Sequence, residues 1–178
     1  MPITTEIQQQ LQHLIRVVPN YPKPDVDFRD ITPLLGSAAD FTLAIVAMIA
    51  PWRDEGITHV IGIESRGFIF GAPVALGLGA GFVPLRKPGK LPGKVVRETY
   101  ALEYGTDTLE MHADALPTGA RVLIVDDVLA SGGTALAAGR LVQYAAAAIA
   151  GYSFLIEIEA LGARGSMPGV RIEATLSY

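Results

Sequence analysis

Four short runs of apolar residues divide the chain, and none of them alternates apolar with polar positions. They span residues 59–63, 82–85, 122–125 and 154–158. Runs of this kind are typical of strands that are buried on both faces. Helix-like segments separate the runs. This order predicts an α/β fold with an open, mostly parallel sheet flanked by helices.

Two helices are expected before the first strand. Apolar residues recur at helical spacing over residues 11–18, and a second helix is expected over residues 41–50 with Asp40 as its N-cap. Residues 19–33 lie between them and carry four prolines and three aspartates. That composition predicts an ordered loop.

Residues 86–116 interrupt the alternation of strands and helices. They combine basic, turn-forming and alternating residues and show no clear helical period. We interpret this stretch as an excursion from the sheet, a hairpin-like flap. The chain has 178 residues, which is enough for one domain with a sizeable core and too few for two comfortable ones. A single domain over residues 1–178 is therefore expected.

Composition narrows the class of protein. Half of the residues are hydrophobic and 18% are charged, which indicates a globular chain, and the formal net charge of −4 argues against a nucleic-acid partner. The absence of cysteine excludes disulfides, thiol catalysis and cysteine-bound metals. No secretory signal is visible, and the longest apolar run, residues 43–52, is too short to cross a membrane. We expect a cytoplasmic protein without membrane contact.

The clearest chemical signal follows the strand at residues 122–125. Two carboxylates, Asp126 and Asp127, come directly after it, and a small-residue loop then leads into an alanine-rich helix expected from Ala135 to the alanine run at 145–148. The loop residues are Ala130, Ser131, Gly132, Gly133 and Thr134.

Such a loop suits a phosphate, because its backbone N–H groups lie at a helix N-terminus. The glycines permit close approach and the hydroxyls of Ser131 and Thr134 can donate. The carboxylates suit sugar hydroxyls, which donate to them. The segment therefore favours a ligand with a phosphate beside a ribose diol. An ordinary acidic turn with a helix cap is the alternative.

Cations follow two other strands. Arg66 comes after the strand at 59–63, and residues 86–97 hold five cations and no acid, with Lys87 near the strand at 82–85. Carboxyl ends of parallel strands share one edge of a sheet, so these cations could meet further phosphates of the same sugar. An ion pair between Arg66 and Glu64, or a solvated basic surface, would be the simpler explanation.

Other motifs are weaker. No P-loop sequence is present, and the glycines at 77–81 precede a strand, so they favour a helix-to-strand turn over a dinucleotide site. The histidines, His13, His59 and His112, are scattered along the chain. Structural roles are expected for them. Phe28 beside Arg29 could bind a base or could pin a loop.

Taken together, these segments resemble the type I phosphoribosyltransferases, and within them the members that act on adenine. Residues 122–134 match the family's motif for 5-phosphoribosyl 1-pyrophosphate, here called the donor. The other matching segments lie earlier in the chain and appear in the family's order, at residues 21–24, 28–32, 64–68, 86–92 and 102–105. The resemblance implies transfer of phosphoribose from the donor to adenine, giving AMP and pyrophosphate.

The resemblance also implies roles for the donor-binding residues. The loop at residues 130–134 would hold the 5′-phosphate, and Asp126 and Asp127 the ribose hydroxyls. Ser65, Arg66 and Lys87 would hold the pyrophosphate, and the peptide before Ser65 would be cis. Mg²⁺ would be held through the donor and water, without direct protein ligands.

On the base side, residues 1–35 would contribute to a small hood. Adenine would lie on Phe28, near the backbone of Asp27 and Arg29, with Ile158 on its other face. Glu103 on the flap would handle the proton of the base, and it is the expected catalytic residue together with Arg66. Asp25 stands where the family commonly has glycine, so the backbone φ at this position needs to be checked. A homodimer is expected.

Two alternatives remain at this stage. The base could be another purine, such as hypoxanthine, guanine or xanthine, because one exocyclic group separates them. The chain could instead be a non-catalytic regulator that binds the donor. Regulators of that kind carry an added DNA-binding domain, and the segment before the donor-binding core is short and not strongly basic.

Overall fold

A five-stranded sheet forms the centre of the computed structural model, which describes residues 4–101 and 105–178. All neighbouring strands are parallel, so the predicted α/β class is confirmed. In spatial order the strands are β4 (Gly81–Leu85), β3 (His59–Ile63), β7 (Arg121–Leu129), β8 (Ala148–Glu157) and β9 (Ile172–Ser177).

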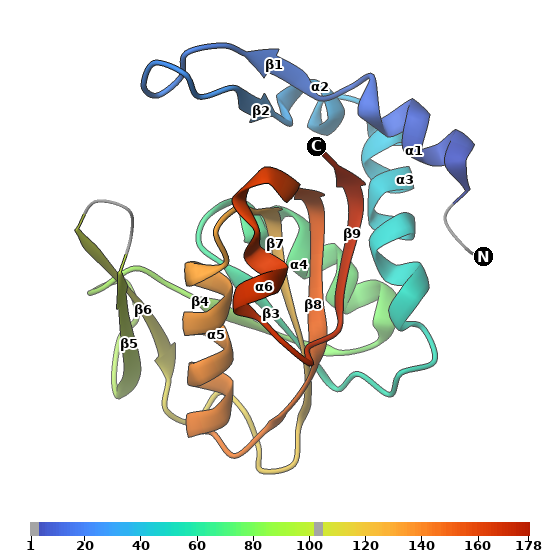
Figure 1. Ribbon diagram of the computed structural model, residues 1–178. Coiled ribbons are helices and arrows are strands. Elements are labelled where there is room, and N and C mark those ends of the chain that lie inside the picture. The colour runs from blue at the N-terminus through green and yellow to red at the C-terminus, as the bar shows by residue number, and fades with distance from the viewer. Residues whose placement is uncertain (1–3, 102–104) are drawn as a thin grey trace.

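Helices cover both faces of the sheet (Figure 1). One face packs against α1 (Thr5–Gln12), α3 (Ala38–Ile49) and α4 (Arg66–Leu78), whereas α5 (Gly133–Tyr144) packs on the other. Val60 faces the first group and its neighbour Ile61 faces α5, and both are fully buried. Burial on both faces explains why the strands read as continuous apolar runs.

Two small antiparallel units extend from this core (Figure 1). β5 (Val95–Ala101) pairs with β6 (Thr106–His112), which is the hairpin expected within residues 86–116. β1 (Arg16–Val18) pairs with β2 (Phe28–Asp30), and α2 (Thr32–Leu35) follows. The short elements are η1 (Ala50–Trp52), η2 (Glu159–Leu161) and α6 (Ala163–Ser166).

The N-terminal part of the sequence prediction was partly wrong. α1 ends at Gln12, and residues 16–18 form a strand instead of the last turn of a helix. Val17 and Val18 are β-branched, and they pair with Arg29 and Phe28 in the antiparallel ladder. The partner strand lies within residues 19–33, so that stretch is more than a loop.

The cap of α3 also differs from the prediction. Ser37, not Asp40, is the N-cap, and its hydroxyl accepts from the Asp40 N–H at 3.3 Å and donates to the Asp40 carboxylate at 2.6 Å. The Ser37 side chain thus caps the helix, and the acid belongs to its first turn. Asp40 therefore takes part in the cap through its contacts with Ser37, but it lies inside the helix and is not the N-cap residue.

The remaining differences concern element ends. α5 starts at Gly133 and stops at Tyr144, and Ala148 already belongs to β8. β7 continues through both carboxylates to Leu129, and β9 was not predicted. Gly79 ends α4 in the left-handed conformation before β4, which confirms the helix-to-strand turn. No helix in the part that the structure describes is long and apolar enough to span a bilayer.

Candidate active site

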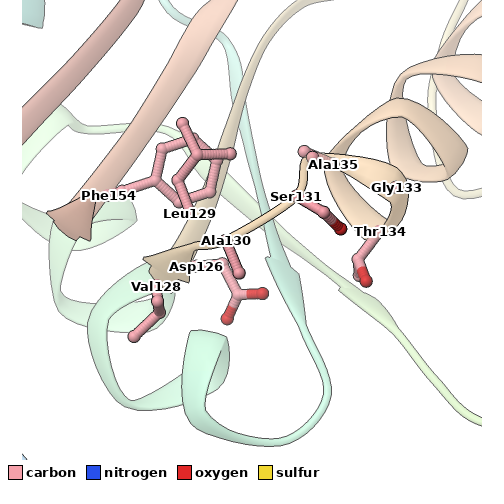
Figure 2. Close-up of a pocket in the computed structure, with 10 residues that line it drawn as sticks. Asp126, Val128, Leu129, Ala130, Ser131, Gly133, Thr134, Ala135 and Phe154 are labelled. Carbon is pink, nitrogen blue, oxygen red and sulfur yellow. The ribbon is translucent and has the colours of Figure 1, made fainter. Parts of the chain in front are cut away.

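The loop between β7 and α5 forms the floor of a small pocket (Figure 2). Gly132 has φ of 88° and is the N-cap of α5, so the turn uses a conformation that suits glycine. Figure 2 shows the hydroxyls of Ser131 and Thr134 at the start of α5, across the loop from the Asp126 carboxylate. The pocket is lined by Asp126, Ala130, Ser131, Gly132, Gly133 and Thr134 among others. All predicted loop residues therefore meet at one site.

Asp126 lines this pocket and is partly exposed, whereas its neighbour Asp127 is buried. The Asp127 N–H donates to Asp126 Oδ1 at 2.9 Å. Burial raises the pKa of Asp126 well above its ordinary value, and the charge of Asp127 adds to the shift. Burial also raises the pKa of Asp127, although Arg66 opposes the rise. Two neighbouring acids in a low-dielectric setting resist simultaneous ionisation.

Asp127 Oδ2 lacks a hydrogen-bond donor, although its residue is only 3% exposed. Arg66 Nε lies 2.9 Å away, which gives an ion pair but not the direction of a hydrogen bond. A buried carboxylate oxygen without a donor is uncommon in folded proteins. The oxygen therefore has unused capacity to accept a hydrogen bond from a ligand.

A glycine brings α4 close to these acids. A Cβ on Gly67 would lie 2.8 Å from Asp126 Oδ1 and 2.9 Å from the Val125 carbonyl oxygen. The absence of a side chain thus lets the first turn of α4 pack on β7 and places Arg66 beside Asp127. Ser65 is the N-cap of α4, and the Glu64–Ser65 peptide is cis, as the resemblance implies.

Arg66 does not pair with Glu64 among the described contacts. Glu64 instead binds Arg86 Nε at 3.0 Å and the Lys87 N–H at 2.7 Å, with Lys90 Nζ at 3.4 Å. The hydrogen bond from Arg86 is the main reason that the pKa of Glu64 falls to about 2. Glu64 therefore organises the basic segment after β4, a role that the sequence analysis missed.

Lys87 lies at the side of the site nearest the hairpin. Its ammonium pairs with Asp107 of β6, and its side chain is 35% exposed. Burial by itself would lower the pKa of Lys87, but the hydrogen bond to Asp107 and the interactions with the Tyr100 and Asp107 charges together outweigh it, and the pKa is raised. The lysine is charged at neutral pH and already has an anionic partner.

A wider cleft of about 570 Å³ adjoins the loop. Phe28 and Ile158 both line it, as do Asp27, Arg29 and Arg66. The remaining lining residues are Pro22, Lys23, Asp25, Val26, Val128, Ala130, Ala160, Leu161 and Tyr178. The predicted base-site residues are thus brought together, next to the predicted donor site.

Ring contacts organise this cleft. The Arg66 guanidinium lies 5.4 Å from the centre of the Phe28 ring, and Tyr21 meets that ring edge-on at 5.3 Å. The Arg29 guanidinium stacks 4.3 Å above the ring of Tyr178. Tyr178 was missed by the sequence analysis, and no motif marked it, because it reaches the cleft from the far end of the chain.

The backbone around the cleft includes one strained residue. Asp25 has φ of 65°, in the left-handed region that favours glycine, and Asn20 Oδ1 accepts from its N–H at 3.1 Å. This positive φ is consistent with the glycine that the family commonly has at this position. Asparagine and aspartate tolerate this region better than most residues.

The predicted catalytic residue Glu103 lies outside the residues that the structure describes. The histidines have local contacts: His13 with the Gln9 carbonyl, His59 with Thr58, and His112 with the Pro92 carbonyl. Within residues 4–101 and 105–178, no group of three or more acidic or histidine side chains could hold a metal ion.

Comparisons with known proteins agree with this geometry. A family model described as a phosphoribosyl transferase domain matches residues 41–161. The chain is 50% identical over 168 residues to an adenine phosphoribosyltransferase of Acaryochloris marina, covering 94% of this chain and 99% of the relative. An adenine phosphoribosyltransferase of Cyanothece is 52% identical over 168 residues, with the same coverage.

Solved structures show the same architecture. The crystal structure of adenine phosphoribosyltransferase from Rhodothermus marinus has a TM-score of 0.93 at 49% identity, covering 98% of this chain and 100% of that one. The Saccharomyces cerevisiae enzyme, solved with an imino-altritol bisphosphate and adenine, has a TM-score of 0.91 at 37% identity, covering 97% and 100%. On these likenesses, the chain belongs to the phosphoribosyltransferases, in the adenine phosphoribosyltransferase family.

Proposed function

We propose that the protein transfers the 5-phosphoribosyl group of 5-phosphoribosyl 1-pyrophosphate to adenine, giving AMP and pyrophosphate in purine salvage. The observation that carries the proposal is the adjacency of two spaces: a small pocket lined by a glycine-rich anion loop and Asp126, and an apolar, ring-lined cleft that shares Val128 and Ala130 with it. The two relatives named adenine phosphoribosyltransferase align with 94% of this chain. The phosphate and the ribose diol of the donor, together with the acceptor base, would use all three parts.

The donor would lie along the loop and the ends of β7 and β3. The loop at residues 130–134 would receive the 5′-phosphate through N–H groups and hydroxyls at the start of α5. Asp126 and Asp127 would accept from the ribose hydroxyls, and the unfilled capacity of Asp127 Oδ2 supports this role. Ser65, Arg66 and Lys87 would bind the pyrophosphate.

The base would enter the wider cleft. Phe28 offers a ring face and Ile158 an apolar surface, which together could enclose a planar purine. The backbone near Asp27 and Arg29 would read the edge of the base. A site built to accept from an exocyclic amino group leaves groups unpaired with hypoxanthine or guanine, which can cost factors of roughly 10⁴.

The chemistry requires the pyrophosphate to leave while the base attacks the anomeric carbon. Positive charge develops on the sugar ring, as in glycoside cleavage, and negative charge on the leaving group. Arg66 and Lys87 would stabilise the leaving anion, and the cleft would orient the base and exclude water. Glu103 would take the proton of the base.

Mg²⁺ would supply further charge neutralisation on the pyrophosphate. The chain's own contribution would be to leave room for an ion held by donor oxygens and water, beside Asp126 and Asp127. Asp127 Oδ2, which is buried without a donor, could accept a hydrogen bond from a water that such an ion holds.

A homodimer also belongs to the proposal. Three apolar side chains on α3 and α4, namely Val46, Ile69 and Leu76, are exposed, and Leu76 is 83% exposed. Apolar surface of this kind is typical of protein contacts. Sedimentation equilibrium should report a dimer that Leu76→Asp weakens. A dimer of unchanged affinity in that variant would place the interface elsewhere.

The transfer reaction is tested by a base screen. Purified protein, the donor and Mg²⁺ are incubated with adenine, hypoxanthine, guanine, xanthine or a pyrimidine, and release of pyrophosphate is followed. Adenine should be turned over at least a thousandfold faster than any other base, in line with the unpaired groups that a wrong base leaves. Comparable turnover with hypoxanthine would point to another purine, and donor binding without turnover would point to a regulator.

A further inference from the structure

A chain of polar contacts runs from the phosphate loop to Lys87 by way of the hairpin. The Thr134 hydroxyl donates to the Tyr100 hydroxyl oxygen at 3.1 Å. The Tyr100 hydroxyl donates to Asp107 Oδ2 at 3.2 Å, and the Lys87 ammonium binds the same oxygen. The proposed sites for the two ends of the donor are thus connected through two residues that no family motif in the sequence marked.

The fold holds these two residues firmly. Tyr100 and Asp107 are direct partners in the β5–β6 ladder, and Tyr100 is only 5% exposed. The second oxygen of Asp107 accepts from the Thr108 N–H at 2.8 Å. Strand β5 also packs on the start of α5, where the Ala101 carbonyl oxygen lies 3.5 Å from the Cβ position of Gly133. The carboxylate therefore has a fixed place relative to the phosphate loop.

A fixed carboxylate matters because lysine is flexible. Its four-carbon stem leaves the ammonium many positions, and ordering it costs conformational entropy. An ammonium has three donor hydrogens, and Asp107 needs only one of them. Lys87 can remain bound to Asp107 while its other hydrogens face an incoming anion, since its side chain is partly exposed.

We propose that Asp107 is a positioning residue for pyrophosphate binding, which together with Tyr100 holds the Lys87 ammonium ready to receive a pyrophosphate oxygen. The inference rests on the proposed function, because that function gives Lys87 its anion. Asp107 acts through Lys87 and need not contact the substrate. Tyr100 extends the arrangement to Thr134 and hence to the site of the 5′-phosphate.

The alternative is an ordinary ion pair that ties the hairpin to the segment after β4. Surface pairs of that kind are weak and fulfil no special role. Three features set this pair apart: a buried tyrosine shares its oxygen, a backbone N–H fixes its other oxygen, and the lysine is the one proposed to bind pyrophosphate. A purely structural pair would leave pyrophosphate affinity unchanged when it is removed.

The test is calorimetric titration with Mg²⁺ and pyrophosphate. Asp107→Asn keeps the shape of the side chain but removes its charge, so the affinity should fall about tenfold, as for loss of one charge-assisted hydrogen bond. Affinity for adenine should stay within twofold. Asp114→Asn is the matched control, because Asp114 is exposed in the same excursion and lies outside the site.

A double-mutant cycle identifies the route of the effect. If Asp107 acts through Lys87, adding Asp107→Asn to Lys87→Ala should weaken pyrophosphate binding no further. Tyr100→Phe removes only the hydroxyl and should weaken binding two- to fivefold, with Tyr144→Phe on the exposed end of α5 as its control. This second variant keeps the test valid if Asp107→Asn fails to fold.

Several results would overturn the inference. Unchanged or tighter pyrophosphate binding in Asp107→Asn would show that the carboxylate only competes for Lys87 or merely braces the hairpin. If adding Asp107→Asn to Lys87→Ala weakens pyrophosphate binding further, Asp107 does not act through Lys87. The titration needs no turnover, so a wild-type protein that binds pyrophosphate but transfers nothing to adenine would refute the proposed function separately.

Discussion

The two halves of the cleft are built in different ways. The donor side comes chiefly from one continuous segment, residues 126–134, at the end of a buried strand. The base side is assembled from residues 22–29, residues 158–161 and Tyr178, which are far apart in the chain. A short sequence motif can specify a phosphate site, because such a site depends on local backbone geometry. A base site that is made of packed surfaces depends on the whole fold.

The halves also differ in electrostatics. On the donor side the cations already have anionic partners: Arg66 pairs with Asp127, Lys87 with Asp107 and Arg86 with Glu64. On the base side, an edge-on ring pair, a guanidinium over a tyrosine ring and apolar surfaces dominate. Donor binding must therefore break these ion pairs or add an anion to them. Base binding mainly buries apolar and aromatic surface. Variants on the two sides should affect different ligands.

The largest effect is expected from the loop. Gly132→Val places a β-branched residue at φ of 88°, near the Ala163 side chain, and should shift the loop. Misplacement of about 1 Å can cost roughly 10²-fold, so kcat/KM for the donor should fall by that order. Steady-state kinetics at saturating adenine measures it.

Gly119→Val is the matched control. Gly119 has φ of 79° and open space around its Cβ position, so the backbone strain is similar but no site is disturbed. Equal loss of donor kinetics in both variants would mean that general destabilisation, and not the loop, causes the effect.

A smaller effect is expected on the base side. Phe28→Ala removes the ring face, and base–aromatic stacking is worth about 1–3 kcal/mol, so KM for adenine should rise about tenfold or more. KM for the donor should stay within twofold, and Phe28→Tyr should restore most of the adenine affinity. A change of more than twofold in KM for the donor would contradict the view that the two sides bind different ligands.

The sequence predicted the parts of the molecule that depend on local patterns. The four apolar runs became β3, β4, β7 and β8, and the loop residues meet where the motif indicated. β9 was missed because residues 172–177 alternate apolar with polar side chains, unlike the continuous apolar runs that identified the other strands. Tyr178 and the Lys87–Asp107 contact could not be predicted, since both arise from tertiary packing.

Asp126 gives a stability test of the donor side. Its folded-state pKa is raised, so the folded protein binds more protons than the unfolded chain, and stability falls as pH rises toward that pKa. Asp126→Asn cannot ionise and should escape this loss. As pH rises above the unfolded value of 3.8, the variant should gain stability relative to wild type in urea unfolding. Parallel pH profiles would contradict the buried-acid assignment.

Glu64 should show the opposite and smaller dependence. Its pKa is lowered to about 2, so its contribution to stability is complete above the unfolded value of 4.5 and is lost as pH falls toward 2. Between pH 5 and pH 3, wild type should lose stability that Glu64→Gln does not, by less than about 1 kcal/mol because the pair is partly solvated. Glu6→Gln, at an exposed helix position, should follow wild type.

The separation of the two sides is tested most directly by Asp127→Asn, with the donor and adenine titrated separately by calorimetry. The amide is a poorer acceptor for a ribose hydroxyl and removes the charge that Arg66 faces. Donor affinity should fall by about 10- to 100-fold, the range for a charge-assisted hydrogen bond, while adenine affinity stays within twofold. Equal losses for both ligands, or a loss confined to adenine, would contradict the account.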